Sequence, residues 1–114
     1  MAANIPLTHR GVANQVLIST GYGRNLSVVD LPMYAAERTI VLLMAVGRIG
    51  EIASNMTTYL GYPVDTPVCI IEKATTPYQR EIHGTLLNIG DIAMKENAKP
   101  PATIVIGDVV NVLL

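Results

Sequence analysis

Residues 67–85, PVCIIEKATTPYQREIHGT, decide how the rest of the chain folds. The apolar run at residues 68–71 predicts a strand that is buried on both faces of a sheet. That run stops at residues 73–77, KATTP, whose small and turn-forming side chains end the strand in a loop. Beyond the loop the pattern changes to period two, which is typical of a half-buried strand. The loop is therefore expected at the carboxyl end of a core strand, where open α/β sheets tend to bind ligands.

Three further strands are predicted outside this stretch. Residues 14–20 are strand-like and end at a glycine-containing turn, and residues 39–46 are a continuous apolar run with β-branched side chains. A third strand covers residues 102–110, and its continuation passes Gly107 at a bulge or a bend.

Two helices are predicted between these strands. From Arg48 onward apolar residues recur at helical spacing, and Gly61 ends this helix in the usual capping position. A second helix over residues 86–97 contains Gly90, which lowers its helix propensity. We therefore expect an α/β fold in a single domain, residues 1–114, with a mixed sheet of about five strands and two or three flanking helices.

Composition limits the function classes. Half of the 114 residues are hydrophobic (50%), 15% are charged, and the net charge is -1. Nucleic-acid binding is not expected, because the chain has no basic excess and no Trp or Phe for base stacking. The longest apolar run, residues 40–46, is far shorter than the ~20 residues of a membrane-spanning helix, and residues 1–6 lack signal-peptide features. We expect a cytoplasmic protein that does not bind a membrane.

Candidate catalytic side chains are few. Cys69 is the single cysteine and stands in an apolar strand, so it is predicted to be buried core. His9 and His83 have no helical partner or cysteine cluster at metal-ligand spacing, so no metal is predicted; His83 is expected to face solvent. Glu72 and Lys73 are neighbours on a strand and point to opposite faces, which separates them as an acid and base pair. No catalytic residue is assigned.

Four motifs add a resemblance to a known family. They are IPLTHRG at residues 5–11, TIVLLMAV at 39–46, ATTPYQR at 74–80 followed by GTL at 84–86, and PPATIVIGDVV at 100–110. In this order and spacing they resemble the carboxyl-terminal half of the uroporphyrinogen-III C-methyltransferases, in the tetrapyrrole methylase family. The most specific pieces are the PLTHR stretch and the TTPxQR loop.

The resemblance implies an activity, a cofactor and a set of site residues. Such enzymes transfer methyl groups from S-adenosylmethionine to uroporphyrinogen III, giving precorrin-2 and S-adenosylhomocysteine without a metal, and the family implies a homodimer. Met44, Ala74 and Ala102 are expected at the cofactor site, where small residues let the backbone approach a ligand. Arg10 is expected to bind a carboxylate of the tetrapyrrole substrate through its guanidinium. The alternatives are that Met44 and Ala102 are core residues and that Arg10 is an ordinary surface arginine.

The resemblance covers only part of a methylase, which leaves other functions open. A complete member begins with a strand and a glycine-rich cofactor loop, and nothing of that kind precedes Asn4. We expect the chain to be about half of an enzyme, with that amino-terminal half absent or supplied by another chain. One alternative is a noncatalytic cofactor-site and dimerisation domain that is inactive alone. Another is a related methylase, such as a precorrin methylase or diphthine synthase, against which the PLTHR stretch argues.

Overall fold

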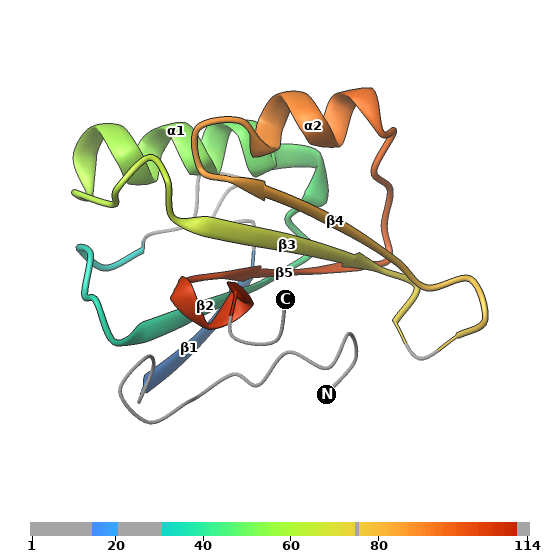
Figure 1. The fold of residues 1–114 in the computed structure, drawn as a ribbon, viewed down its shortest axis with the longest axis horizontal. Coiled ribbons are helices and arrows are strands. Elements are labelled where there is room, and N and C mark those ends of the chain that lie inside the picture. Colours follow the sequence, from blue (N-terminus) through green and yellow to red (C-terminus); the bar gives the residue numbers. More distant parts are fainter. Residues whose placement is uncertain (1–14, 21–30, 75, 112–114) are drawn as a thin grey trace.

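A mixed five-stranded sheet forms the centre of the structure, a computed structural model that describes residues 15–20, 31–74 and 76–111 (Figure 1). The strands lie in the order β1-β2-β5-β3-β4, so the last strand in sequence occupies the middle of the sheet. β1 and β2 are parallel, and every other neighbouring pair is antiparallel. The strand bounds are Gln15–Thr20 for β1, Arg38–Leu43 for β2, Pro67–Glu72 for β3, Arg80–Thr85 for β4 and Ala102–Ile106 for β5.

The stretch quoted first forms the hairpin of β3 and β4, as its pattern predicts. β3 lies between β5 and β4, and every one of its residues is buried. β4 lies at the edge and alternates: Ile82 is buried opposite Ile70, while Glu81 and His83 face the other side. This register follows from the period-two pattern, since a slip of one residue would expose Ile82.

Two helices cover one face of the sheet (Figure 1). α1, Ile49–Tyr59, buries the predicted apolar stripe, and Gly61 follows its end with a φ of 80°. α2, Ile89–Lys95, is shorter than predicted and buries Ile89 and Ala93. The two helices touch where Gly90 meets Gly50, which gives the glycine in α2 a packing role.

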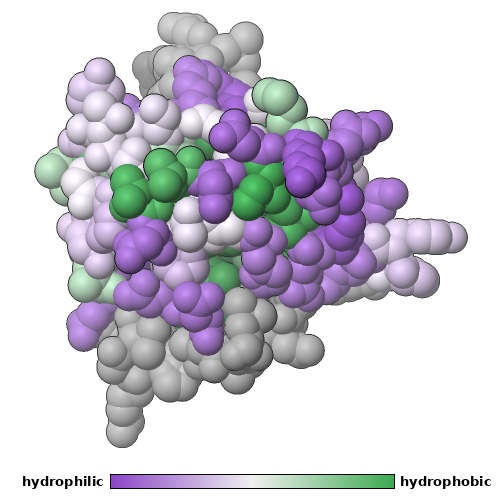
Figure 2. Space-filling view, turned by 45° about the horizontal axis from the view of Figure 1, so that its top comes forward, coloured by the Kyte–Doolittle hydropathy of each residue, from purple (hydrophilic) through white to green (hydrophobic). Residues whose placement is uncertain are grey.

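The main core lies between the helices and the sheet. It joins the inward residues of α1 and α2 to those of four strands, and its largest fully buried members are Ile40, Leu42, Ile52, Met56, Val68, Ile70, Ile89, Ile104 and Ile106. On the outer surface of the helix-covered side, hydrophobic side chains form small groups separated by polar ones (Figure 2). Scattered apolar residues of this kind are ordinary on a folded surface.

The opposite face of the sheet also carries buried side chains. Val41, Cys69, Ile71 and Val105 point to this side, and each is at most 5% exposed. Val109 and Val110 of the short 3-10 helix η4, Asp108–Asn111, are buried as well. The prediction that Cys69 is a buried core residue is confirmed.

The predicted fold class is confirmed, with corrections at two strand ends. The strand predicted over residues 39–46 ends at Leu43, because Met44 has a φ of 57° and leaves the sheet; residues 46–48 then form the short 3-10 helix η3, Val46–Arg48. The strand predicted over residues 102–110 ends at Ile106, because Gly107 has a φ of 144° and turns the chain into η4. In the described part of the chain no helix has the length and apolarity needed to cross a membrane.

Candidate functional site

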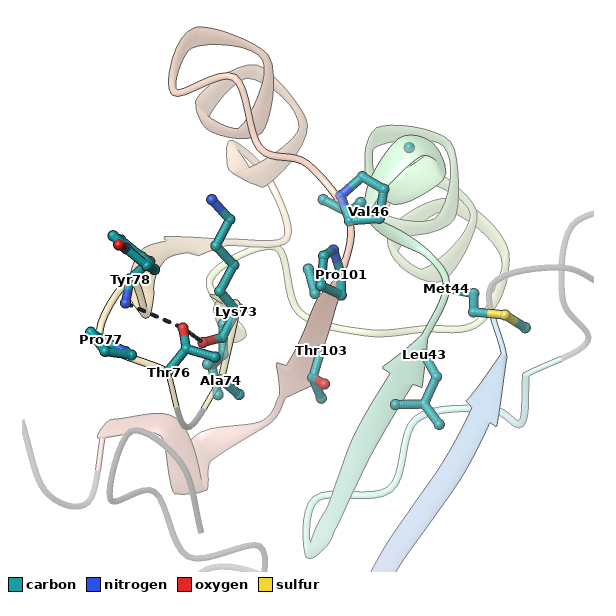
Figure 3. A pocket seen from close by; sticks show the side chains of 14 residues that line it. Leu43, Met44, Val46, Lys73, Ala74, Thr76, Pro77, Tyr78, Pro101 and Thr103 are labelled. Carbon is teal, nitrogen blue, oxygen red and sulfur yellow. Dashed lines mark hydrogen bonds between the residues drawn. The ribbon is translucent and has the colours of Figure 1, made fainter.

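An open cleft of about 1140 Å³ lies at one end of the sheet, at the carboxyl ends of β2 and β3 and the start of β5 (Figure 3). Three separate segments form its walls: the end of β2 with the turn after it, the loop after β3, and the Pro100–Pro101 turn that leads into β5. The lining residues are Leu43, Met44, Val46, Gly47, Ile71, Lys73, Ala74, Thr76, Pro77, Tyr78, Pro100, Pro101, Ala102 and Thr103. The cleft therefore lies where the first stretch predicts a ligand site.

Both strands that end at the cleft finish in a residue with left-handed backbone. Met44 follows β2 with a φ of 57°, and Lys73 follows β3 with a φ of 50°. This conformation is uncommon for residues other than glycine and collects at functional sites. At both places the chain turns sharply away from the sheet.

Thr76 holds the loop after β3 in shape. Its hydroxyl donates a hydrogen bond to the Lys73 carbonyl at 2.7 Å and accepts one from the Tyr78 amide at 3.2 Å (Figure 3). The backbone adds two turns, from Thr76 N to Lys73 O and from Gln79 N to Thr76 O. Local hydroxyl-to-backbone bonding of this type is why threonine suits loops. Thr76, the second threonine of the TTPxQR motif, thus has a structural role: it fixes the shape of the loop.

Glu72 ties this loop region to α2 and to the turn before β5. Its buried carboxylate accepts a hydrogen bond from Arg80 Nε at 2.5 Å and another from the Lys99 amide at 2.6 Å. Arg80 also donates to the Glu96 carbonyl at the end of α2. The hydrogen bond from Arg80 holds the pKa of the Glu72 carboxyl below its ordinary value, so Glu72 is charged at neutral pH. The wall formed by Pro100 and Pro101 is anchored next to it, where Lys73 N donates to Pro101 O.

The described lining of the cleft is mostly apolar and contains no carboxylate. Its charged group is Lys73, which is exposed and whose ammonium lies 5.9 Å from the centre of the Tyr78 ring. Such a surface suits a ligand with an apolar or aromatic body and an anionic group.

The structure brings together the three residues predicted at a cofactor site. Met44, Ala74 and Ala102 all line the same cleft, each from a different wall. Met44 is 64% exposed, so the alternative that it is a core residue is wrong. Ala102 is the first residue of β5 and is partly buried against the core. Arg10 lies outside the described residues.

Sequence reasoning did not single out three residues that shape this site: Lys73, Thr76 and Pro101. The sequence pattern presents Lys73 only as a strand neighbour of Glu72, whereas in the structure β3 ends at Glu72 and Lys73 begins the loop. Glu72 binds Arg80, and Lys73 lines the cleft. Thr76 and Pro101 stood inside the quoted motifs. Both are turn-forming residues next to the end of a predicted strand, and this sequence feature could have predicted that they lie at the cleft.

Comparisons with known proteins agree with this geometry. Residues 1–90 match the family model of the tetrapyrrole (corrin/porphyrin) methylases. A uroporphyrinogen-III C-methyltransferase of Methanocaldococcus jannaschii is 42% identical over 97% of this chain and 47% of its own length. A probable uroporphyrinogen-III C-methyltransferase of Schizosaccharomyces pombe is 38% identical over 99% of this chain and 23% of its own.

Solved structures with a similar fold also include methyltransferases that act on tetrapyrroles. The uroporphyrin-III C-methyl transferase of Thermus thermophilus, in complex with S-adenyl homocysteine, is 34% identical with a TM-score of 0.82, over 97% of this chain and 47% of that one. A cobalt precorrin-4 methyltransferase, 21% identical, shares the fold with a TM-score of 0.79. The fold and cleft thus define an α/β domain of the methylase type, and the chain belongs to the tetrapyrrole methylase family. It spans about half the length of the Methanocaldococcus relative, and less of the Schizosaccharomyces one.

Proposed function

We propose that this chain is the carboxyl-terminal part of an S-adenosylmethionine-dependent uroporphyrinogen-III C-methyltransferase, which makes precorrin-2. The observation that carries the proposal is the convergence of Met44, Ala74 and Ala102 on one cleft. It is supported by the Thermus relative, whose structure holds S-adenyl homocysteine. On this proposal residues 1–114 act as one domain, and further residues complete the active site.

The walls of the cleft fit the proposed cofactor. Ala74 and Ala102 are small, so a ligand can approach the backbone beside them, and Met44 presents an exposed thioether. S-adenosylmethionine combines a flat adenine with an amino-acid end, and the apolar lining suits the first of these. The carboxylate of the amino-acid end is negatively charged, and the Lys73 ammonium in the cleft lining can pair with it.

The proposed reaction needs alignment more than acid or base groups. Bound S-adenosylmethionine would supply an electrophilic methyl group to a pyrrole carbon of the substrate. The sulfur would keep the electron pair of the broken methyl–sulfur bond, and the methylated ring would lose its positive charge by releasing a proton to solvent. The cleft orients the methyl donor and excludes water from one side of it. Arg10 would bind a substrate carboxylate through its planar guanidinium.

Ala102→Leu tests the cofactor site. In the complete enzyme the larger side chain should block the approach to the start of β5 and weaken S-adenosylhomocysteine binding by roughly tenfold or more. Isothermal titration calorimetry measures this, and circular dichroism checks that the fold survives. Ala36→Leu is a matched control, because Ala36 is exposed and lies outside the cleft. If Ala102→Leu and Ala36→Leu bind S-adenosylhomocysteine with equal affinity, Ala102 is not part of the cofactor site.

Arg10→Leu tests the substrate contact separately. Loss of a charge-assisted hydrogen bond should lower kcat/KM for uroporphyrinogen III by roughly ten- to a hundredfold, with cofactor affinity unchanged. Arg10→Lys should recover only part of the loss, because an ammonium cannot bind a carboxylate at two points. Normal kinetics in Arg10→Leu would contradict the assignment, and a joint fall in melting temperature and activity would indicate a structural role.

We further propose that the complete enzyme is a cytoplasmic homodimer. Ile18 on the edge strand β1 is 62% exposed, and Leu43, which pairs with Thr20 at the end of β1, is 40% exposed, so this edge offers apolar surface to further protein. Light scattering tests the oligomeric state, and a monomer at micromolar concentration would contradict the dimer.

A further inference from the structure

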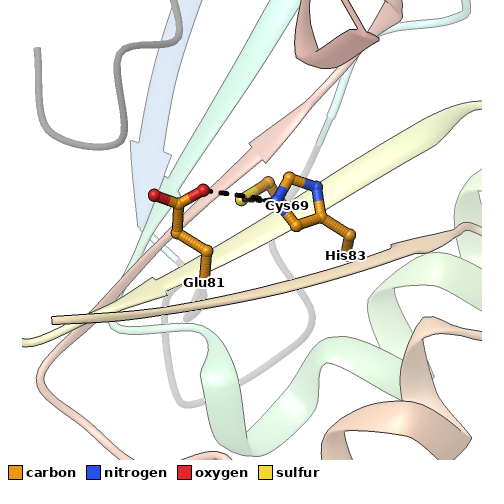
Figure 4. A group of neighbouring side chains, drawn as sticks. All are labelled: Cys69, Glu81 and His83. Carbon is orange, nitrogen blue, oxygen red and sulfur yellow. Dashed lines mark hydrogen bonds and ion pairs between the residues drawn. The ribbon is translucent and has the colours of Figure 1, made fainter. Parts of the chain in front are cut away.

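Three side chains able to bind metal ions meet on the face of the sheet opposite the helices (Figure 4). Cys69 comes from β3, and Glu81 and His83 come from β4. Cys69 and His83 face each other across the hairpin, and Glu81 stands two residues before His83 on the same side of its strand. Their ligand atoms all lie within 4.8 Å of one another.

Both contacts in this cluster use the same nitrogen. His83 Nε2 lies 3.7 Å from Cys69 Sγ and 3.3 Å from Glu81 Oε1. A ring nitrogen either donates its one proton or accepts with its one lone pair. It can therefore donate to the Glu81 carboxylate or accept from the Cys69 thiol, and a hydrogen-bonded network leaves one of these contacts without a bond.

A metal ion would satisfy all three groups at once. Zinc lies about 2.3 Å from a thiolate and about 2.0–2.1 Å from an imidazole nitrogen or carboxylate oxygen, with tetrahedral angles. Those lengths place a sulfur and a nitrogen ligand about 3.6 Å apart, and a nitrogen and an oxygen ligand about 3.3 Å apart. The observed separations of 3.7 Å and 3.3 Å match both values. The third pair, Cys69 Sγ and the Glu81 carboxylate, lies within 4.8 Å and would approach to about 3.6 Å on metal binding.

We propose that Cys69, Glu81 and His83 form a binding site for Zn²⁺ or a similar thiophilic divalent cation, with a water molecule as the fourth ligand. Thiolate, imidazole and carboxylate are all ligands that zinc accepts, and three protein ligands with one open position are a common arrangement. The site joins the edge strand β4 to β3. It is separate from the proposed methyl-transfer reaction, which uses no metal.

The surroundings of the cluster allow an ion to enter. The side chains of His83 and Glu81 are 34% and 33% exposed, so the site opens to solvent on the β4 side, above the buried thiol. Burial, with a smaller effect from the Glu81 charge, raises the pKa of the Cys69 thiol to about 12. Without metal the thiol thus keeps its proton at neutral pH, and binding displaces that proton to solvent as the bond from sulfur to metal forms.

Cobalt titration of the 114-residue chain tests the site directly. Metal-free protein should gain a thiolate-to-cobalt charge-transfer band in the near ultraviolet on addition of Co²⁺, and Zn²⁺ should abolish that band by competition. Cys69→Ala should remove the band. His83→Gln and Glu81→Gln should each weaken Zn²⁺ binding by at least about tenfold, since even indirect support of a metal ligand is worth that much.

A matched control and a stability readout complete the test. Glu51→Gln changes an exposed glutamate on α1, far from the hairpin in sequence, and should leave Zn²⁺ affinity unchanged. Zn²⁺ should raise the melting temperature of the wild type and not that of His83→Gln, a variant at the exposed edge strand that keeps the core intact. Absence of a charge-transfer band in the wild type, or equal Zn²⁺ affinity in His83→Gln and the wild type, would overturn the proposal. If Cys69→Ala does not fold, the Zn²⁺ affinity and the melting temperature of His83→Gln still test the proposal.

Discussion

Glu72 joins two strands and the turn before β5, next to the loop that lines the candidate site. Its carboxylate links β3 to Arg80 of β4 and to the Lys99 amide before β5. The sequence pattern places Glu72 and Lys73 as neighbours on one strand, but β3 ends at Glu72 and Lys73 begins the loop with a φ of 50°. Glu72 instead binds two groups from other elements. Its two partners could not be predicted, because one depends on the hairpin register and the other on a loop 27 residues away in sequence.

The lowered pKa of Glu72 makes a prediction about acid stability. A carboxyl group whose folded pKa lies below its unfolded value stabilises the fold above the unfolded pKa and loses this effect as pH falls through the folded pKa. Glu72→Gln should therefore lower the free energy of unfolding by about 1 to 3 kcal/mol at neutral pH. The difference from wild type should shrink below the ordinary pKa of 4.5.

Denaturant unfolding at a series of pH values measures this difference. Glu51→Gln is the control, because Glu51 forms an exposed ion pair with Arg48 and should change stability little at any pH. Curves for wild type and Glu72→Gln that stay parallel down to acid pH would show that Glu72 does not contribute through its charge.

At the scale of elements, the two helices meet through glycine. A Cβ atom on Gly90 would lie 2.8 Å from the Gly50 Cα, which is closer than real Cβ contacts allow. Gly90→Ala should thus destabilise the fold, because an overpacking cost of about 1–3 kcal/mol exceeds the helix-propensity gain of about 1 kcal/mol. Thermal unfolding measures the change.

Gly50→Ala is the matched control for that prediction. A Cβ atom on Gly50 would lie 3.5 Å from the Gly90 Cα, an ordinary contact. Its stability should equal or slightly exceed that of the wild type, since alanine favours the helix. If Gly90→Ala were as stable as Gly50→Ala, close helix packing would not explain the glycine in α2.

Element types were more predictable from the sequence than element ends. Apolar periodicity gave the hairpin and α1, because burial on one face enforces that period. Met44 and Gly107 ended their strands earlier than the apolar runs predicted. The sequence alone does not distinguish an apolar residue that continues a strand into the core from one that leaves the strand and faces a cleft. Met44 is of the second kind and is 64% exposed.

The sequence also did not predict clusters of side chains that form across two strands. Metal-ligand motifs are recognised by short spacings along the chain, and Cys69 and His83 are 14 residues apart. They face each other only because the loop length and register of the hairpin place them opposite. Spacing rules for ligands on one helix cannot detect such a pair.

At the scale of the whole molecule, we predict that residues 1–114 alone do not methylate uroporphyrinogen III. The cleft supplies one side of the proposed site, whereas methyl transfer requires both reactants to be held in line. Transfer of labelled methyl from S-adenosylmethionine measures this, with and without the amino-terminal half of the Methanocaldococcus relative. Activity should require both parts.

The same assay separates the remaining alternatives. Turnover by the 114-residue chain alone would contradict the prediction. Binding of S-adenosylhomocysteine without turnover, even with the second part present, would favour a noncatalytic cofactor-site domain. Methylation of another tetrapyrrole in preference to uroporphyrinogen III would indicate a related methylase.

The position of β5 has a consequence for how the protein is made. β2 and β3 do not pair with each other; each pairs with β5, whose residues 102–106 leave the ribosome after the other four described strands. Before then, the strands that the structure describes can pair only as β1 with β2 and as the hairpin of β3 with β4, and isolated two-stranded units are marginal in water. Translation therefore completes the sheet in one late step, and a nascent chain stalled before residue 102 should remain a substrate for chaperones and proteases.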